Sequence, residues 1–581
     1  MLKLLKYAKR NHLFYFIAST VFLFLQTFLD LSIPDYMSDI TNMIQTGTAT
    51  TEALLQSGAG MLLCALGATV CAIITGYYSS RLAASFSADL RFEIFNKVQS
   101  FNKAEIDRFS TASLITRSTN DVIQIQNFSA RGLKMIVRAP IIIGVALYKM
   151  SIRYWQWSAA TAVTVILIII VIVVLIKFAH PRFRRMQKLM DEVNYSMREN
   201  MTGVRVIRAF NAQDHQLRVF DKANSNLRNN ERKARSILHL MPSTNQFASN
   251  ALTVAIYCIG AFLIVNTTSN TEKIAIFTDM VVFSSYASKM LQGLSSVEIV
   301  FNMIPRAATS AERILEILDT QASILPGDKE FADDSGTVEF RDVSFKYPGM
   351  TDMAISDINF TAKAGQTIGI IGSTASGKST LVKLIPRLYD VTEGSILVDG
   401  TDIRDVDCKE LRSRISYVPQ EAILFSGTVE ENVDYGEHSA HVGSAEERVD
   451  EAIDIAQAKE FVDKLPEKIR SLVYRGGRNI SGGQKQRLSI ARGICRKPEI
   501  CIFDDTFSAL DYKTEKRLRA RLEKDLAGST MIIVSSRIAA VRNADCILVM
   551  DEGKIVGKGK HEELLGTCRV YKEIYQTQLP D

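Results

Sequence analysis

Long apolar stretches are concentrated in the first half of the chain. A helix needs about 20 mostly apolar residues to cross the hydrocarbon of a bilayer. Six stretches approach this length: Leu13–Pro34, Ser57–Tyr78, Leu133–Ser151, Ser158–Phe178, Gln246–Val265 and Ile274–Ile304. The fourth is the clearest, whereas Arg138 and Pro140 interrupt the third. The pattern therefore predicts six transmembrane helices, preceded by a basic amphipathic segment that lies along the membrane surface.

Charge in the connections predicts the orientation of these helices. Lys3, Lys6, Lys9 and Arg10 precede the first span, whereas 35–56, between the first two spans, has no Lys or Arg. The positive-inside rule then places both ends of the chain in the cytoplasm. The connections Ser79–Arg131 and Ala179–Met241 are long, charged and helically periodic, so we expect helices that extend beyond the bilayer.

The last 250 or so residues read as a separate α/β domain, and they begin with a phosphate-binding motif. The apolar strand Thr367–Ile371 leads into GSTASGKST, and a helical pattern follows over Ser379–Leu388. This order is that of a P-loop, whose backbone N–H groups surround phosphates. Lys378 is expected to reach the β- and γ-phosphates, and the Ser379 hydroxyl to bind Mg²⁺. The whole loop comprises Gly372, Ser373, Thr374, Ala375, Ser376, Gly377, Lys378, Ser379 and Thr380.

A second apolar strand, residues 500–503, ends in Asp504 and Asp505. A carboxylate at such a strand end holds the magnesium ion in P-loop NTPases, and Asp504 fits this role. We therefore predict ATP and Mg²⁺ as the ligands of the C-terminal domain.

Between these motifs lies NISGGQ, followed by a basic helix. It resembles the signature of ATP-binding cassette (ABC) transporters, usually LSGGQ, and the resemblance covers nearly the whole chain. The resemblance implies an exporter-type half-transporter: a six-helix membrane domain over 1–320, a linker over 321–335 and an ABC-type nucleotide-binding domain over 336–581. In the family, two such domains dimerise head to tail, and each signature covers ATP bound to the opposite P-loop. Here the signature residues are Ile480, Ser481, Gly482, Gly483 and Gln484.

Further family elements occur in the expected order. Tyr347 matches the aromatic residue that stacks on adenine, and Gln420 matches the Q-loop residue that senses Mg²⁺. The D-loop, which communicates between the two sites, corresponds to Ser508, Ala509, Leu510 and Asp511. The resemblance also implies coupling helices near Lys103–Ser110 and Arg208–His215 that dock on the nucleotide-binding domains, although Ser113 stands near the place of a usual Gly.

Two departures from the family pattern fall at the catalytic centre. Asp505 occupies the position of a usual Glu, the presumed base or orienter of the attacking water, and reaches roughly 1.5 Å less. A misplacement of about 1 Å can cost about a hundredfold in rate. Ser536 occupies the position of the switch His, and no His lies between His441 and His561. Arg475 is a third departure, to which we assign no effect.

These departures lead to the hypothesis of a degenerate nucleotide site. The chain would bind Mg-ATP, hydrolyse it slowly and lend its signature to a competent P-loop on a different subunit. This pattern resembles heterodimeric bacterial multidrug exporters, so the expected partner is a second ABC half-transporter, and the expected cargo amphipathic small molecules or drugs. Alternatives are a lipid flippase, a peptide exporter, an importer, a homodimeric exporter, and an ATP-gated channel or regulator. The Ser158–Phe178 stretch excludes a soluble P-loop enzyme.

The composition of the chain and the charged residues within its spans say less about function than the motifs do. The net charge of +6 over 581 residues gives no argument for nucleic acid, and the eight cysteines show no metal-ligand spacing. Free thiols and the absence of an organellar presequence favour a bacterial plasma membrane, with lipid as the surroundings. Ionisable residues within spans are candidates for a substrate cavity. They include Glu298, Lys289 and Arg138, whereas Lys149 and Lys177 are expected to extend toward the membrane surface.

Overall fold

The computed structural model describes residues 2–151, 155–331, 335–436 and 444–578. These residues form two compact units. The first comprises Met1–Gln99 and Ala112–Thr320, and the second comprises Ser100–Thr111 and Gln321–Asp581. A short segment from the membrane half therefore folds as part of the second unit. Each unit is described by itself below.

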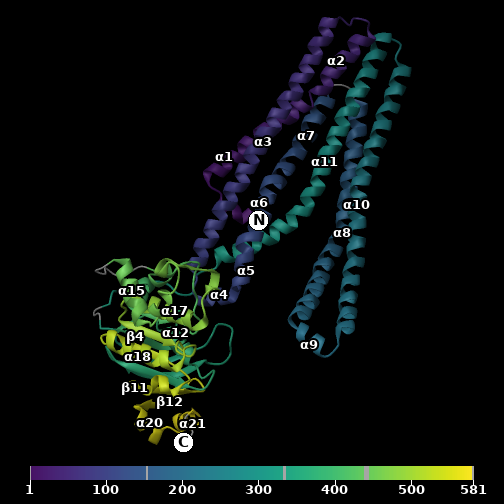
Figure 1. Cartoon of the computed structure of the whole chain (residues 1–581). Coiled ribbons are helices and arrows are strands. Elements are labelled where there is room, and N and C mark those ends of the chain that lie inside the picture. The colour runs from purple at the N-terminus through teal and green to yellow at the C-terminus, as the bar shows by residue number, and fades with distance from the viewer. Residues whose placement is uncertain (1, 152–154, 332–334, 437–443, 579–581) are drawn as a thin grey trace. The chain divides into compact units, whose positions relative to one another are not determined.

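The first unit consists of helices, several of them about fifty residues long (Figure 1). After the 3₁₀ helix η1 (Leu2–Tyr7), its elements are α1 (Arg10–Asp30), α2 (Ile33–Gln45), α3 (Thr51–Gln99), α5 (Thr111–Thr116), η2 (Arg117–Asp121), α6 (Val122–Asn127), η3 (Phe128–Gly132), α7 (Leu133–Ser151), α8 (Trp155–Thr202), α9 (Val204–Ala209), α10 (Gln213–Asn266) and α11 (Asn270–Asp319). Helices α8 and α10 lie side by side, as do α1 and α3 (Figure 1). Both long charged connections are helical extensions of the spans, as the sequence predicts.

Within the described residues, five helical segments are long and apolar enough to cross a membrane. They are Arg10–Gln45, Thr51–Gln99, Trp155–Thr202, Gln213–Asn266 and Asn270–Gly293. The third predicted span forms helix α7, but its three basic residues, Lys134, Arg138 and Lys149, keep it out of this set. The first predicted span is broken, because α1 ends at Asp30 and Pro34 lies in the first turn of α2.

Aromatic packing holds the core of the first unit together. Trp157 of α8 is fully buried, and its ring lies 4.9 Å from that of Phe283 of α11. Its indole N–H donates a 3.1 Å hydrogen bond to the backbone carbonyl of Ile256 in α10. Three helices distant in sequence therefore meet at one buried side chain whose polar atom is satisfied.

The second unit is built on a six-stranded sheet of order β12-β11-β3-β10-β9-β6, parallel except for β12. A four-stranded antiparallel sheet of order β2-β1-β4-β5 and a two-stranded β7-β8 pair complete it. The strands are β1 (Val338–Phe345), β2 (Ile355–Ala362), β3 (Thr367–Gly372), β4 (Glu393–Val398), β5 (Thr401–Asp402), β6 (Ile415–Val418), β7 (Gly427–Thr428), β8 (Leu472–Val473), β9 (Ile500–Asp504), β10 (Thr530–Val534), β11 (Cys546–Asp551) and β12 (Lys554–Gly559).

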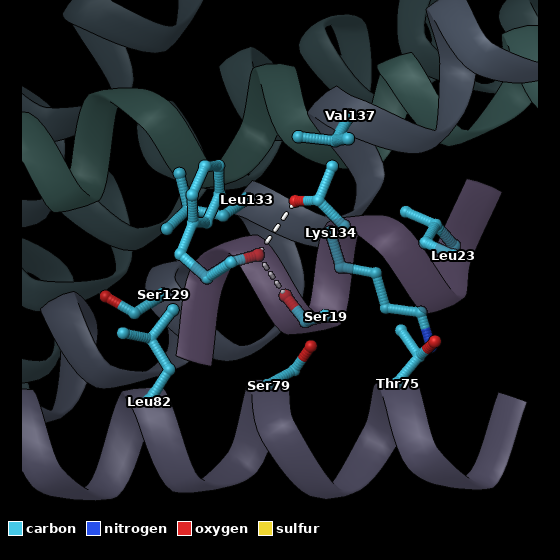
Figure 2. A pocket seen from close by; sticks show the side chains of 11 residues that line it. Ser19, Leu23, Thr75, Ser79, Leu82, Ser129, Leu133, Lys134 and Val137 are labelled. Carbon is cyan, nitrogen blue, oxygen red and sulfur yellow. Dashed lines mark hydrogen bonds between the residues drawn. The ribbon is translucent and has the colours of Figure 1, made fainter. Parts of the chain in front are cut away.

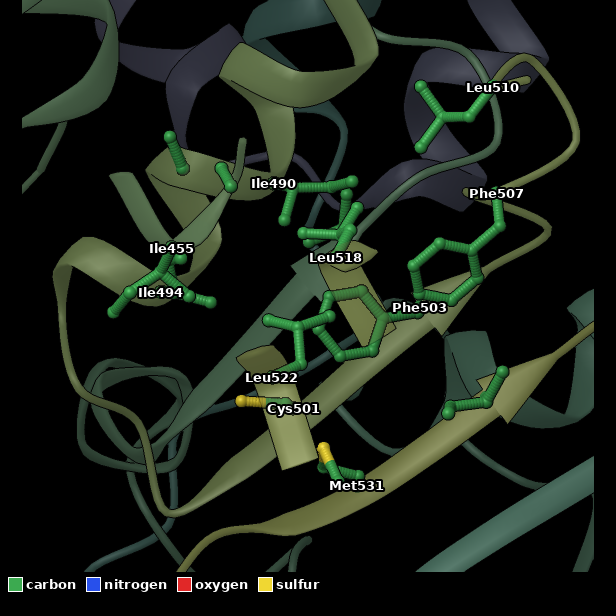
Figure 3. Close-up of a cluster of buried hydrophobic side chains, with 14 of the residues drawn as sticks. Ile455, Ile490, Ile494, Cys501, Phe503, Phe507, Leu510, Leu518, Leu522 and Met531 are labelled. Atoms are coloured by element: carbon green, nitrogen blue, oxygen red, sulfur yellow. The ribbon is translucent and has the colours of Figure 1, made fainter. Parts of the chain in front are cut away.

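Helices flank the parallel strands, which are buried on both faces and therefore apolar throughout. The helices of this unit are α4 (Lys103–Phe109), α12 (Lys378–Leu384), α13 (Cys408–Arg414), α14 (Val429–Val433), α15 (Ala445–Ile455), α16 (Lys459–Val462), η4 (Lys468–Arg470), η5 (Arg475–Gly477), α17 (Gly482–Cys495), α18 (Tyr512–Asp525), α19 (Ile538–Val541), α20 (His561–Thr567) and α21 (Arg569–Gln578). Figure 3 shows the core beside β9, where Phe503 packs with Ile490 of α17 and Leu518 of α18. This packing fixes the end of β9, which carries Asp504.

Candidate nucleotide-binding site

The loop Gly372–Gly377 connects strand β3 to helix α12 and has the backbone of a phosphate cradle. Gly377 has φ +95°, a conformation that costs glycine little. A Cβ at Gly372 would lie 2.2 Å from the carbonyl oxygen of Met550, so only glycine fits there. Helix α12 is shorter than expected, since it ends at Leu384 and turns follow up to Leu388.

Lys378 is the first residue of helix α12, directly after this loop, and is almost fully buried. Its Nζ donates hydrogen bonds of 2.9 Å to the carbonyl of Gly372 and 2.6 Å to that of Ser373. Burial lowers the pKa of Lys378, although the charges of Asp505 and Asp504 act in the opposite direction. The loop thus holds a cation that faces two carboxylates at the end of β9.

Asp504 is the most buried acid of the site, at 2% exposure, and both of its oxygens are engaged. The Ser379 hydroxyl donates a 2.7 Å hydrogen bond to Oδ1, and the Tyr417 hydroxyl donates a 2.9 Å hydrogen bond to Oδ2. Burial, together with the Asp504 charge, raises the pKa of Tyr417, so this phenol stays protonated. Ser379 and Asp504, predicted from separate motifs, are therefore direct neighbours.

Asp505 differs from Asp504 in its backbone and its partner. It adopts φ +47°, where Asp is tolerated better than most side chains. The side-chain amide of Gln420 donates a 3.0 Å hydrogen bond to its Oδ2. Burial, and next the Asp504 charge, raise the pKa of Asp505.

A cavity of about 420 Å³ opens beside the P-loop. Of the predicted residues, it is lined by Tyr347 and by Ala375, Ser376, Gly377, Lys378, Ser379 and Thr380. The Tyr347 hydroxyl lies 3.0 Å from that of Thr380, which places the aromatic ring beside the loop. This glycine-lined space, with one cation, a hydroxyl and a neighbouring carboxylate, fits a nucleotide with its magnesium ion.

Sequence reasoning missed several residues of this site. Met353, Ala354, Glu552 and Gly553 also line the cavity, and Tyr417 binds Asp504. Tyr417 could have been found from the parallel pairing of β6 with β9, which sets it beside Ile502, near the carboxyl end of β9. The turn between β11 and β12 carried no recognisable signal.

The signature and the D-loop do not line this cavity. Ser481 is exposed at the N-cap of α17, and its backbone N–H donates a 2.9 Å hydrogen bond to the side-chain carbonyl of Gln484. Gly483 faces the D-loop, since a Cβ there would lie 3.3 Å from the carbonyl of Ala509. Asp511 caps α18 by accepting a 3.0 Å hydrogen bond from Thr514. Of the remaining predicted residues, Leu510 also lies near Gly483, Ile480 is buried in the core, Gly482 is exposed, and the Ser508 hydroxyl donates a 2.8 Å hydrogen bond to the carbonyl of Asp505.

Ser536 follows β10 and is exposed. Its backbone carbonyl accepts a 2.6 Å hydrogen bond from the side-chain amide of Gln578 in α21. Among the described residues its hydroxyl has no hydrogen-bond partner. Arg475 is also exposed, in η5.

The first predicted coupling helix is α4, which folds with the second unit. The Tyr389 hydroxyl donates a 2.8 Å hydrogen bond to the carboxylate of Asp107. The Ser323 backbone N–H donates a 3.0 Å hydrogen bond to the carboxylate of Glu105. The second predicted range, Arg208–His215, is not a single helix: it contains the end of α9 (Val204–Ala209), a turn with Asn211 at φ +53° and the start of α10.

In the first unit, two of the three predicted cavity residues line one cavity. Arg138 of α7 and Lys289 of α11 line a space of about 290 Å³. The side chain of Glu298 lies outside the described part of the chain. Lys149, near the end of α7, forms an ion pair with Asp35 of α2.

A P-loop beside an acidic strand end, in one chain with several helices long enough to span a bilayer, defines a membrane-bound ATPase. The chain belongs to the ABC transporter family: residues 16–293 match the ABC transporter transmembrane region, and residues 355–508 match the ABC transporter ATP-binding family. It therefore hydrolyses ATP and couples this reaction to transport.

Relatives support this assignment along nearly the whole chain. An uncharacterized ABC transporter ATP-binding protein of Mycobacterium tuberculosis is 38% identical over 91% of this chain and 90% of its own. An ATP-dependent lipid A-core flippase of Pseudomonas aeruginosa is 30% identical over 87% of this chain and 82% of its own. The fold matches a bacterial Atm1-family ABC exporter with ATP bound, with a TM-score of 0.79, 20% identity and 98% coverage of both chains. The fold is thus that of an exporter-type half-transporter, a class that functions as dimers.

Proposed function

We propose that this chain is one subunit of a heterodimeric exporter that moves amphipathic small molecules or drugs out across a bacterial plasma membrane. In this proposal its own site binds Mg-ATP but hydrolyses it slowly, and its signature completes the site of the partner. The observation that carries the proposal is the identity of two residues: Asp505, which follows β9, and Ser536, which follows β10, stand at the positions of the family's Glu and switch His, whereas the P-loop motif is complete.

The cradle residues divide the work of binding. The backbone N–H groups of the loop and the ammonium of Lys378 would hold the phosphates, and Tyr347 would stack on the base. Ser379 and Asp504, already 2.7 Å apart, would hold Mg²⁺, which neutralises charge on the transferred phosphoryl group. Tyr417 orients Asp504 through its second oxygen. All parts needed to bind the nucleotide are therefore present in this chain.

The two residues expected to act on the attacking water, Asp505 and Ser536, are less suited to catalysis than the Glu and His that the family usually has. The short carboxylate of Asp505 is held by Gln420, a bond that directs it toward the end of β6. A carboxylate that falls about 1 Å short of its water can lose about a hundredfold in rate. Ser536 offers an uncharged hydroxyl where a His would supply a longer, ionisable side chain. Both changes lower turnover without removing a phosphate contact.

The position of the signature supports action on a second subunit. Ser481 is exposed at the start of α17, and none of the signature residues lines the cavity beside the P-loop. A helix N-terminus with exposed N–H groups favours an anion. In the family arrangement this end would face the γ-phosphate bound to the partner, whose own Glu and His would drive hydrolysis.

The test compares the purified chain with the chain co-purified with the half-transporter encoded beside it. We expect ATP binding but slow turnover from the chain alone, and rapid turnover from the pair. Asp505→Asn in the pair should leave most of the activity, whereas substitution of the Glu that the partner is expected to carry at the position of Asp505 should abolish it. Rapid hydrolysis by the chain alone, lost in Asp505→Asn, would instead establish a homodimeric exporter.

A second candidate cargo is a lipid. The support is the 30% identity to lipid A-core flippases over more than four fifths of both chains. Vesicle assays that follow a labelled lipid and a labelled drug in parallel separate the two. Lipid movement without drug transport would favour the flippase.

A further inference from the structure

The cavity that contains Arg138 and Lys289 is polar and carries excess positive charge. Its lining also includes Thr27, Gln292 and Ser296, and among the described residues Asp30 is the one acid that lines it. Lys289 Nζ donates a 2.6 Å hydrogen bond to the backbone carbonyl of Asp30, the last residue of α1. An ammonium has three donors, so two remain available to a ligand.

A second, larger cavity of about 670 Å³ lies between helices of the same unit. Among the described residues, three arginines and no acidic residue line it: Arg131, Arg306 and Arg235, of which Arg235 forms an ion pair with Glu231. Its other lining residues include methionines and a phenylalanine, which offer adaptable apolar surface: Met135, Met186, Met303 and Phe183. The cavity thus combines positive charge with an apolar wall.

Both cavities are lined by the same two helical segments. Along η3 and α7, Arg131 and Met135 line the larger cavity, and Arg138 and Ile142 line the smaller. Their spacing of three or four residues places them on one helix face. Along α11, Lys289, Gln292 and Ser296 line the smaller cavity, and Ile299, Met303 and Arg306 line the larger. We call Arg131, Arg138, Lys289 and Arg306 the basic track.

The basic track is not neutralised within the described part of the chain. Arg131, Arg138 and Arg306 form no hydrogen bond or ion pair there. Other lysines of the same helix are accounted for differently. Lys149 pairs with Asp35, and Lys134 lies in a small cavity of about 10 Å³, lined by the hydroxyls of Thr75 and Ser79 (Figure 2). That volume holds about one water molecule, so Lys134 is not part of a substrate site.

We infer that the membrane half binds amphipathic anions. Their acidic group lies against the basic track, and their apolar part lies against the apolar wall formed by the three methionines and Phe183 of the larger cavity. The inference rests on the proposed export function and specifies its substrate class. Arg138 lies within the predicted span of α7 and has no hydrogen-bond or ion-pair partner among the described residues, so its burial in a membrane is costly and an anionic ligand would supply the missing partner. Coulomb repulsion from the same side chains disfavours cationic amphiphiles. Cationic drugs are therefore poor substrates.

Binding to the full-length chain in phosphatidylcholine nanodiscs, without ATP, tests this inference. The probes carry one fluorescent acyl chain and differ in headgroup: lysophosphatidic acid, lysophosphatidylcholine and an alkyltrimethylammonium. We expect lysophosphatidic acid to bind at least about tenfold more tightly than either of the others. Taurocholate serves as a soluble competitor. Competition by it assigns the site to amphipathic anions in general, and its failure to compete assigns the site to anionic lipids.

Charge variants identify the residues. Arg138→Gln combined with Lys289→Gln should weaken lysophosphatidic acid binding about tenfold or more and leave lysophosphatidylcholine within about twofold. The charge-conserving pair Arg138→Lys with Lys289→Arg should restore binding, which excludes misfolding as the cause. Lys177→Gln, which removes an exposed charge from α8, is the matched control.

Three results would overturn the inference. They are equal binding of the anionic and cationic probes, unchanged binding in the double Gln variant, and equally tight binding of inorganic phosphate alone. The experiment does not depend on hydrolysis or on a partner subunit. Anion binding without export would contradict the proposed function alone, and export of cations would contradict this inference alone.

Discussion

The side-chain amide of Gln420 donates a 3.0 Å hydrogen bond to the carboxylate of Asp505 and so connects the end of β6 to the end of β9. Asp505 has a backbone φ of +47°, and its backbone N–H donates a 3.0 Å hydrogen bond to the carbonyl of Val534 in β10. Three neighbouring strands therefore fix this carboxylate. Because its backbone is constrained, the length of its side chain decides how far the carboxylate reaches.

Asp505→Glu should increase the ATPase activity of the isolated chain. The longer side chain extends the carboxylate by roughly 1.5 Å, and we expect a gain of about tenfold to a hundredfold. Steady-state phosphate release measures the effect. Asp505→Asn is the control and should give no gain, and an Asp505→Glu rate equal to wild type would place the defect elsewhere, at Ser536 first.

Asp505→Asn should raise the melting temperature at neutral pH. The folded-state pKa of Asp505 lies above the unfolded value of about 3.9, because burial and the Asp504 charge disfavour ionisation. The stability that protonated Asp505 contributes is therefore complete below the unfolded pKa and is lost as the pH rises through the folded pKa. Asn removes the repulsion and can still accept from Gln420. We expect a rise of about 2 °C or more at pH 7.

Thermal unfolding of both proteins at several pH values checks this sign. The difference in melting temperature should shrink as the pH falls through the raised folded-state pKa of Asp505, because the wild-type carboxyl then becomes neutral as well. A lower melting temperature for Asp505→Asn at pH 7 would show that the ionised carboxylate is stabilising.

The motifs of the nucleotide site could be located from the sequence because each combines local backbone demands with a fixed chemical role. Gly372 is needed because a side chain would clash with its neighbours, and Gly377 because its φ is positive. The continuous apolar residues of the strand that ends in Asp504 indicate that this strand is buried. The contact between Ser379 and Asp504 follows from the order of motifs. The site could therefore be assembled from the sequence except for residues whose role depends on sheet pairing, such as Tyr417.

The membrane half was predicted less completely. The apolar pattern located six spans, but the third, α7, carries three basic residues whose surroundings only the structure gives: Arg138 lines a cavity with Lys289, and Lys149 pairs with Asp35. The break after Asp30 was missed, because a proline in the first turn of a helix differs little in sequence from one within a span. Periodicity gives the face of a helix, whereas the neighbour of that face is a tertiary property.

Tyr417→Phe should destabilise the second unit without abolishing ATP binding. The substitution removes the hydrogen bond to Asp504 Oδ2 and leaves a carboxylate oxygen in a buried site with one partner fewer. Such a loss costs about 1–3 kcal/mol. Tyr417 does not line the cavity, so binding of a fluorescent ATP analogue should persist. Thermal unfolding measures the loss, and an unchanged melting temperature would show that a water molecule replaces the phenol.

Asp107→Ala should uncouple transport from ATP hydrolysis. Asp107 lies in α4, at the tip of a connection between membrane helices, and accepts a 2.8 Å hydrogen bond from Tyr389. Burial opposes ionisation of Asp107, but the bonds from Lys103 and Tyr389 outweigh it and lower its pKa. The contribution of this contact is therefore present above the unfolded pKa of about 3.9 and lost as the pH falls through the lower folded value. Coupling should not vary between pH 6 and 8 on this account.

The measured quantity is the number of substrate molecules moved per ATP in vesicles that contain the complete exporter. We expect Asp107→Ala and Tyr389→Phe to lower this ratio severalfold, while the ATPase rate without substrate stays near wild type. Asp107→Asn keeps an acceptor for Tyr389 and should retain most of the coupling, so it separates the hydrogen bond from the charge. Because Tyr389 is buried, a Phe ring fits its site, and the loss reports the missing hydroxyl rather than a cavity. A ratio unchanged in both variants would mean that coupling does not depend on this hydrogen bond, and the bond from the Ser323 backbone N–H to the Glu105 carboxylate would be the next candidate.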